Sequence, residues 1–320
     1  MKKFFIGLLI CLCAQSVCAQ VNLVWQERKE WAQGLPPAIK IYEFQGNLPT
    51  TQRKVHIVYA KIDLKDKNLK IKSIASENGK GLELTPDLAT KNSAVLAING
   101  GYFTFKPDTA KQELSSVSLL VSEGKTIAVN QSVVSRKDKS GATHICYPTR
   151  SAFGFNGKKM DVAWVYAYEG ENYYYDRPNP ISDDFEQLQP SKKMPSKRKK
   201  WKMKEAMGGG PVLVENSTKK ITDKEELFSQ IAGINPRTAV GYTNNREVIF
   251  LVVDGRQEIS EGVTFDELAD IFLGLGVKEA INLDGGGSST FWVNGKVVNN
   301  PSDKTGLRKV ASVLIIQKKE

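Results

Sequence analysis

Apolar and polar residues alternate along much of the chain, a pattern typical of strands with one buried face. Val55–Ile74 alternates on both sides of an Asp-Lys-Asn turn and predicts two strands. The run Ala94–Ile98 is apolar throughout, which favours a strand buried on both faces. Ser118–Val129 predicts a hairpin around Ser-Glu-Gly, and Thr238–Asp254 predicts two strands around Asn244-Asn245. The chain is therefore expected to be rich in antiparallel strands.

Helical signals are fewer. Thr85-Pro86 predicts the start of a short helix, with Thr85 as N-cap. The segments 222–225 and 264–267 both match a capping box, and the second is followed by an apolar stripe at helical spacing. The predicted fold class is α+β: mixed, largely antiparallel, strand-rich sheets with a few packed helices.

The first 19 residues have the features of a secretory signal peptide. Two lysines precede an apolar run from Phe4 to Cys13, and small residues ending at Ala19 offer a cleavage site. We expect a single domain at 20–320, exported to the periplasm or secreted. No later apolar stretch is long enough for a transmembrane segment.

The net charge of +10 arises locally. Eight Lys or Arg and no acid lie in the run Lys192–Lys204, and these eight plus the two leader lysines account for the whole excess. The run ends a proline-rich segment, 176–204, which predicts an irregular, mobile insertion. It is either a solvated loop or an electrostatic guide toward an anionic envelope polymer or a membrane surface. Nucleic acid is not an expected partner of an exported chain.

Glycine clusters beside polar residues mark the candidate chemistry. Asp284 ends an apolar strand and precedes three glycines and two serines, a loop whose free N–H groups could bind an anion. The loop is neither a Walker phosphate loop nor a nucleophile elbow. Asp254 is a second acidic residue at the end of a predicted strand, and Arg256 follows two residues later. Arg237 begins another predicted strand. Arginine suits recognition of a phosphate or carboxylate. The chain's two histidines argue against a His-dependent triad.

Five ordered motifs, spread over residues 94–316, carry a resemblance to a known family. They are Asn99-Gly-Gly-Tyr-Phe103, Gly208-Gly-Gly-Pro211, Arg237-Thr-Ala-Val-Gly241, Val253-Asp-Gly-Arg256 with Ser260 and Gly262, and Asn282-Leu-Asp-Gly-Gly-Gly-Ser-Ser289. Together they resemble the phosphodiester glycosidase family. The insertion 176–204 lies outside this pattern.

The resemblance implies an exported glycoside hydrolase that cleaves a sugar C1–O–phosphate bond. It implies Asp284 and Asp254 as catalytic carboxylates, without assigning nucleophile or base. The expected substrate-binding residues are Asn99, Tyr102, Arg237, Thr238, Arg256, Asn282, Gly286, Gly287 and Ser288. No cofactor or metal is expected. The partner is a carbohydrate or glycosyl-phosphate substrate.

Two alternatives remain open. One is a non-catalytic envelope or carbohydrate-binding protein on the same fold, with the basic segment as its anchor. The other is a glycosidase that acts on an unphosphorylated glycan.

Overall fold

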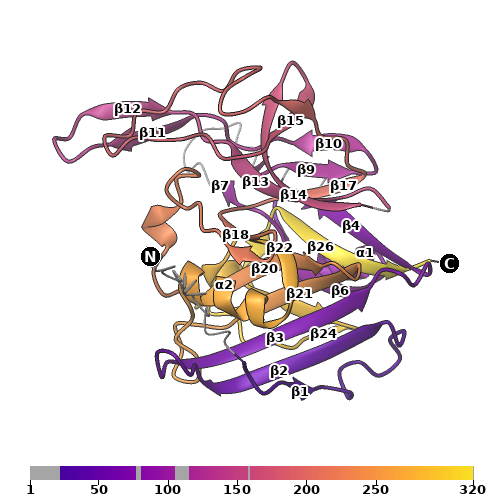
Figure 1. The fold of residues 1–320 in the computed structure, drawn as a ribbon. Coiled ribbons are helices and arrows are strands. Elements are labelled where there is room, and N and C mark those ends of the chain that lie inside the picture. Colours follow the sequence, from indigo (N-terminus) through magenta and orange to yellow (C-terminus); the bar gives the residue numbers. More distant parts are fainter. Residues whose placement is uncertain (1–21, 77–80, 105–114, 158, 320) are drawn as a thin grey trace, which may run out of the picture.

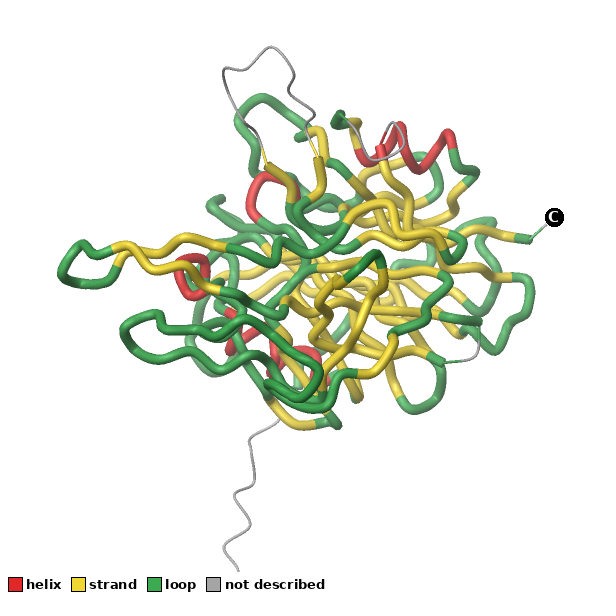
Figure 2. The backbone as a smooth tube through the Cα atoms, turned by 90° about the horizontal axis from the view of Figure 1, so that it is seen from above, coloured by secondary structure: helices red, strands yellow, loops and turns green. Residues whose placement is uncertain are grey.

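The computed structural model describes residues 22–76, 81–104, 115–157 and 159–319, so the predicted leader 1–19 lies outside it. Within these ranges 44% of residues form strands and 9% form helices, and the paired strands run antiparallel. The predicted α+β class is therefore wrong, because the fold is mainly β. Figure 2 shows how few segments are helical.

The two capping boxes explain the error. The one at Thr264 begins α2 (Phe265–Gly274) as predicted, with Thr264 and Glu267 capping each other. The segment 222–225 forms turns before the 3-10 helix η2 (Ser229–Ile231). The next residue, Glu226, is fully buried and accepts hydrogen bonds from distant backbone and side-chain groups, and Leu227 has a φ of +62°. Tertiary contacts thus replace a helix here.

The eight-stranded sheet carries most of the predicted motifs. Its strands, in spatial order, are β1 (Gln26–Glu27), β2 (Ile39–Asn47), β3 (Lys54–Asp63), β21 (Glu247–Val253), β20 (Arg237–Thr243), β22 (Val277–Asn282), β18 (Val212–Glu215) and β19 (Thr218–Lys219). The strand pair β20–β21 confirms the one predicted around Asn244-Asn245.

A five-stranded sheet lies beside it (Figure 1). Its order is β24 (Lys296–Val297), β23 (Phe291–Val293), β6 (Ala94–Asn99), β26 (Ser312–Lys318) and β4 (Leu69–Ala75). The two strands predicted in Val55–Ile74 are β3 and β4, which join different sheets instead of pairing with each other.

These two sheets share one apolar core, and each is covered by a helix on its other face. Leu96 and Val58 belong to the shared cluster. Ala97 faces the other way and packs with Leu88 of α1 (Thr85–Lys91), which confirms that β6 is buried on both faces. The N-cap of α1 is Leu84, one residue before the predicted Thr85. Helix α2 covers the larger sheet.

A seven-stranded sheet lies at the top of Figure 1. Its order is β10 (Lys125–Ala128), β9 (Leu120–Ser122), β17 (Glu205–Gly208), β13 (Arg150–Phe155), β14 (Met160–Tyr168), β15 (Glu171–Tyr175) and β16 (Lys199–Lys200). The pair β9–β10 confirms the predicted hairpin. Phe153 and Leu120 extend from this sheet into the core of the other two.

The predicted insertion 176–204 has little regular structure but helps to build this layer. Buried Asn179 donates hydrogen bonds to the carbonyl oxygens of Tyr147 and Leu188. Trp201 and Met203 pack in a core cluster of the seven-stranded sheet. The segment is therefore part of the folded body, which differs from the expected mobile loop.

Three two-stranded ribbons complete the strands of the described ranges: β11 (Val134–Lys137) with β12 (Thr143–Cys146), β25 (Lys309–Val310) with β5 (Glu83–Leu84), and β7 (Phe103–Thr104) with β8 (Ser115–Ser116). The loop after β22 contains the 3-10 helix η3 (Gly286–Ser288). Among the described residues, no helix has the length and apolar character needed to cross a membrane.

Candidate active site

Asp284 follows β22 in a loop that is held by buried polar side chains. Its carbonyl oxygen accepts a hydrogen bond of 2.6 Å from Asn99 Nδ2, and Asn99 Oδ1 accepts from Thr238 Oγ1 at 2.7 Å and from the Thr290 N–H at 3.1 Å. Asn99 and Thr238 are fully buried. They join three strands and hold both ends of the loop, so their place in the fold is that of supports, behind the pocket surface.

The Asp284 loop opens into a pocket of about 250 Å³. Arg237, Arg256 and Arg308 line it together with Asp284, which is the acidic residue of this lining. Tyr102, Asn282 and Gly286 also line it, whereas Gly287, Ser288, Asn99, Thr238 and Asp254 do not. The structure thus gathers six of the eleven predicted site residues around one cavity.

The electrostatics of Asp284 suit a group that exchanges protons near neutral pH. Burial raises the pKa of Asp284 from an ordinary 3.8 to about 6, although the Ser288 hydroxyl, Arg308 and the Gly285 N–H oppose the shift. Asp284 is only partly buried and lines the pocket, so its carboxyl group can be reached from the pocket. A pKa close to the working pH is the condition for effective general acid–base catalysis.

Arg237 is the most enclosed of the three cations. Its Nε donates to the Val263 carbonyl oxygen at 3.0 Å and its Nη2 to that of Ile231 at 2.9 Å. The guanidinium carbon lies 4.0 Å from the centre of the Phe265 ring. Burial lowers the pKa of Arg237 to about 10, so the group stays charged at neutral pH. These contacts fix the guanidinium in place before any ligand arrives.

Arg256 and Arg308 lie against the glycine loop from outside. Arg256 Nη2 donates to Asn235 Oδ1 at 2.7 Å, and Arg308 Nε donates to Asp303 Oδ2 at 2.7 Å. A Cβ atom at Gly286, whose φ is +62°, would lie 3.3 Å from Arg256 Nη2. One at Gly287 would lie 2.6 Å from Arg308 Nη2. The glycines are required because side chains here would displace the two guanidinium groups.

The loop amides contribute less to anion binding than the sequence suggested. The Gly286 N–H donates to the Pro236 carbonyl oxygen at 2.9 Å, and the Ser288 N–H donates to that of Gly285 at 3.2 Å. Ser288 is fully buried, and its hydroxyl acts on the Asp284 carboxyl group. The arginines therefore carry the positive charge of the site.

Tyr102 and Asn282 form the opposite wall. Asn282 Nδ2 donates to the Tyr102 hydroxyl at 2.8 Å, which donates in turn to the Gly210 carbonyl oxygen at 2.8 Å. The Tyr102 ring stacks on Phe228 with 4.8 Å between ring centres. Burial raises the pKa of Tyr102 far above its ordinary value, so the phenol stays protonated. These contacts hold both side chains in fixed positions on the pocket lining.

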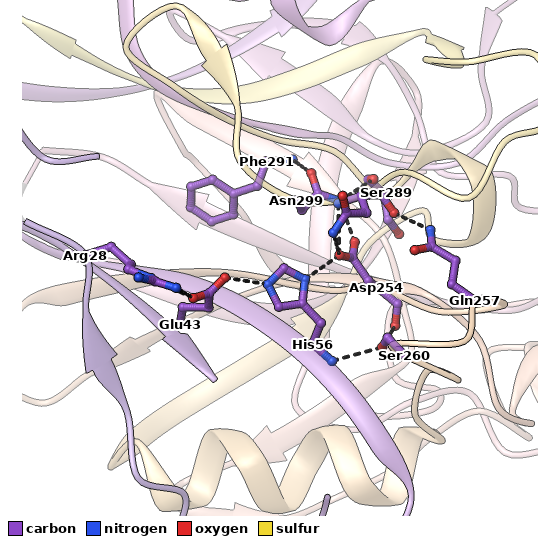
Figure 3. A network of polar contacts seen from close by, with 10 residues as sticks. Arg28, Glu43, His56, Asp254, Gln257, Ser260, Ser289, Phe291 and Asn299 are labelled. Carbon is purple, nitrogen blue, oxygen red and sulfur yellow. Dashed lines mark hydrogen bonds and ion pairs between the residues drawn. The ribbon is translucent and has the colours of Figure 1, made fainter. Parts of the chain in front are cut away.

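Asp254 lies in a different, buried network (Figure 3). Its two oxygens contact His56 Nδ1 at 2.6 Å, Asn299 Nδ2 at 2.8 Å and the Asn300 N–H at 2.9 Å. The side chain is 1% exposed. With both oxygens occupied, Asp254 connects β3 to the segment that precedes Arg308. Its placement supports a structural role.

The network continues outward from His56. His56 Nε2 contacts Glu43 Oε1 at 2.6 Å, and Arg28 forms an ion pair with the same carboxylate. Burial alone would lower the pKa of His56, but the hydrogen bonds to Asp254 and Glu43 outweigh it and raise the pKa above 6.5. The two carboxylates therefore favour the protonated form of His56.

Two parts of this arrangement escaped the sequence reasoning. Arg308 belongs to no glycine motif, and its only signal is a lone Arg after Gly306. His56 lies within the alternating strand β3 and has no polar motif around it. Elsewhere in the described ranges, no three His, Cys, Asp or Glu side chains lie close enough to hold a metal ion.

Comparisons with known proteins identify the family of this chain. The family model described as phosphodiester glycosidase matches residues 92–317. N-acetylglucosamine-1-phosphodiester alpha-N-acetylglucosaminidase from Bos taurus is 46% identical over 70 residues, which are 22% of this chain and 13% of that protein. The enzyme of the same name from Homo sapiens is 41% identical over 83 residues, 26% of this chain and 16% of that protein.

Solved structures share the fold. The catalytic domain of zebrafish N-acetylglucosamine-1-phosphodiester alpha-N-acetylglucosaminidase matches with a TM-score of 0.59 and 20% identity, covering 89% of this chain and 85% of that one. A hypothetical protein from Synechocystis matches with a TM-score of 0.61 and 14% identity, covering 92% and 64%. Because the family model covers most of the chain, including every residue of the pocket, this protein belongs to the phosphodiester glycosidase family, a family of hydrolases.

Proposed function

We propose that this protein hydrolyses a glycosyl phosphodiester by cleaving the bond between the sugar C1 and the phosphate oxygen. One observation carries the proposal: Asp284, with its raised pKa, shares a pocket with three arginine side chains. Three arginines and one carboxylate that line the same cavity suit a substrate that is anionic at one end and uncharged at the other.

The arginines hold the phosphate in this proposal. Arg237 is fixed by its carbonyl contacts, and Arg256 and Arg308 approach from the loop side. The leaving group is a phosphate monoester with a second pKa near 6, so it departs without strong protonation. As charge develops on the leaving oxygen, fixed guanidinium groups stabilise it without reorganising.

Asp284 acts on water. It accepts a proton from a water molecule whose oxygen bonds to C1, while the C1–O bond to phosphate breaks and the electron pair leaves with the phosphate. One carboxylate suffices because the leaving group needs no acid. A direct displacement inverts the anomeric centre. Proton NMR of the first sugar released should show inversion, whereas retention would make Asp284 a nucleophile.

Asp254 is not needed as a second catalytic carboxylate in this scheme. Its oxygens are occupied by His56, Asn299 and Asn300. An inverting enzyme with two carboxyl groups would place both in one cleft, about 6.5–9.5 Å apart. The pocket lining includes only one of the two predicted aspartates.

The substrate class follows from the relatives and the charge of the pocket. The mammalian relatives are named for an N-acetylglucosamine-1-phosphodiester, and we propose a sugar-1-phosphodiester of this kind for the present chain. The apolar segment at the N-terminus supports export.

The decisive experiment compares two substrates of the same sugar: the methyl ester of N-acetylglucosamine 1-phosphate and the nitrophenyl glycoside of N-acetylglucosamine. The phosphodiester should have the higher kcat/KM by at least about 100-fold, because it alone engages the arginines. Asp284→Asn serves as the inactive control. Faster turnover of the glycoside would favour a glycosidase for unphosphorylated glycans, and binding without turnover of either would favour a carbohydrate-binding protein.

A further inference from the structure

A second concave region, lined by lysines, lies at the opposite end of the larger sheet. One cavity of about 470 Å³ and a neighbouring one of about 890 Å³ share Lys204 in their linings. Arg246 lines the first and lies in the turn after β20, whereas Arg237 begins that strand and lines the Asp284 pocket. Seven residues of strand separate the two regions by roughly 20 Å. We call the joined cavities the basic cleft.

The charge of the basic cleft is not neutralised internally. Among its lining residues, Lys72 forms ion pairs with Glu123 and Glu205, and Glu171 is paired with Lys200. The other lysines of the lining have no ion pair within the part of the chain that the structure describes: Lys67, Lys70, Lys125, Lys202, Lys204 and Lys319. Glu123 also attracts Lys70 and Lys125, and Asp66 is a further acid of the lining, but the lysines still outnumber the acidic residues.

The cations of the basic segment Lys192–Lys204 have two different roles. Arg198 stacks on the rings of Tyr168 and Tyr173, and Lys199 pairs with Asp176, so these cations serve the fold. Lys202 and Lys204 are exposed and alternate with the buried Trp201 and Met203. All four residues line the larger cavity, in which the two lysines supply the exposed charge.

We propose that the basic cleft binds a phosphate-bearing glycan chain, so that the protein is retained on a polymer whose glycosyl-phosphate groups it hydrolyses. This inference rests on the proposed function for the choice of polymer. Six unpaired lysines arranged along two adjoining cavities match an extended series of negative charges, beyond the size of one sugar phosphate.

The shape and remaining lining favour a glycan. The lysines line concave cavities, which a chain can enter and a flat bilayer cannot follow. Asn172 Nδ2 donates to Thr126 Oγ1 at 2.8 Å, and both residues line the larger cavity, so amide and hydroxyl groups lie beside the lysines. Such groups hydrogen-bond to sugar hydroxyls.

The test measures binding of phosphomannan, a glycan that carries phosphodiester groups, to the full-length chain with Asp284→Asn, which prevents turnover. The variant Lys125→Gln/Lys202→Gln/Lys204→Gln should lose at least about 10-fold in affinity at low salt and show a shallower salt dependence, because fewer counterions are displaced. The matched control Lys192→Gln/Lys193→Gln/Lys197→Gln removes the same charge from exposed residues of the same segment outside the cleft. It should lose less than about 3-fold.

Equal losses of phosphomannan affinity in the two triple variants would contradict binding in the basic cleft and would indicate a diffuse electrostatic effect. Absence of phosphomannan binding, or stronger binding to a single-stranded DNA oligonucleotide or to phosphatidylglycerol vesicles, would overturn the choice of ligand. With Asp284 intact, the cleft variant should hydrolyse the methyl phosphodiester at the wild-type rate. This readout separates the inference from the proposed function, because either can fail alone.

Discussion

At the residue scale, the environment of Asp284 determines what this carboxyl group can do. A strand-end carboxylate in water would have a pKa near 4 and would be a poor base at neutral pH. Enclosure in the arginine-lined pocket raises the pKa of Asp284 to about 6. Arg308 partly offsets this effect of burial, since a cation favours the ionised form.

The substitution Asp284→Asn should abolish turnover and raise stability at neutral pH. The folded-state pKa lies above the ordinary value, so folding favours the protonated form. The wild type therefore loses stability as pH rises from about 4 through 6, and an amide does not. A shift of about two pKa units corresponds to at most about 3 kcal/mol.

Urea unfolding of both proteins at pH 4 and pH 7.5, beside kcat, checks this prediction. The difference in unfolding free energy should be small at pH 4 and should favour the variant at pH 7.5. A folded variant with activity near wild type would remove Asp284 from the mechanism.

Substituting Arg308 tests the phosphate site while Asp284 stays in place. Arg308→Gln should raise KM for the methyl phosphodiester by about 10- to 100-fold and weaken product inhibition by the phosphate monoester by a similar factor, because a charge-assisted contact is lost. Lys309→Gln, an exposed neighbour, is the control. An unchanged inhibition constant would place Arg308 outside the phosphate site.

At the element scale, the buried network of Figure 3 couples strands that are far apart in sequence. Glu43 on β2 and His56 on β3 connect through Asp254, at the end of β21, to Asn299. Asn299 Oδ1 accepts the Phe291 N–H of β23 at 2.7 Å, so the network joins the two packed sheets. A buried ion pair of this kind is costly to break, because it leaves a charge unpaired.

His56→Gln should therefore destabilise the protein by about 3 kcal/mol at pH 6. The pKa of His56 is raised, so its contribution is complete below pH 6.5 and declines as pH rises through the folded-state value. The loss caused by the substitution should shrink between pH 6 and pH 9, as measured by urea unfolding.

His144→Gln provides a matched control, because His144 pairs with Asp138 at 2.8 Å at a more exposed position. Its cost should stay below about 1 kcal/mol. Equal costs for the two substitutions would contradict the importance of the buried network.

At the scale of the whole molecule, three sheets share one apolar cluster, so the site and the basic cleft belong to one folded body. The Asp284 pocket lies where β20 and β22 approach the five-stranded sheet, and the basic cleft lies where the turn after β20 meets β4 and the seven-stranded sheet. This arrangement separates catalysis from the proposed polymer retention.

The sequence by itself determined several strands, among them β3, β4, β6, β20 and β21, together with the helix α2 and the loop that presents Asp284. These features depend on local patterns: alternation, a capping box, and glycines after an apolar strand. Motif order also identified Arg237 and Arg256 as partners of Asp284, because both lie beside glycine motifs at strand ends.

Only the tertiary structure decided the rest. The segment 222–225 forms turns instead of the predicted helix start, because Glu226 is needed as a buried hydrogen-bond acceptor. The fold is therefore mainly β. The tertiary structure also brought Arg308 to the pocket and directed Asp254 toward His56 instead. Partners more than a hundred residues apart leave no periodic trace in sequence, since their contact depends on how the sheets pack and on which carboxylates are enclosed.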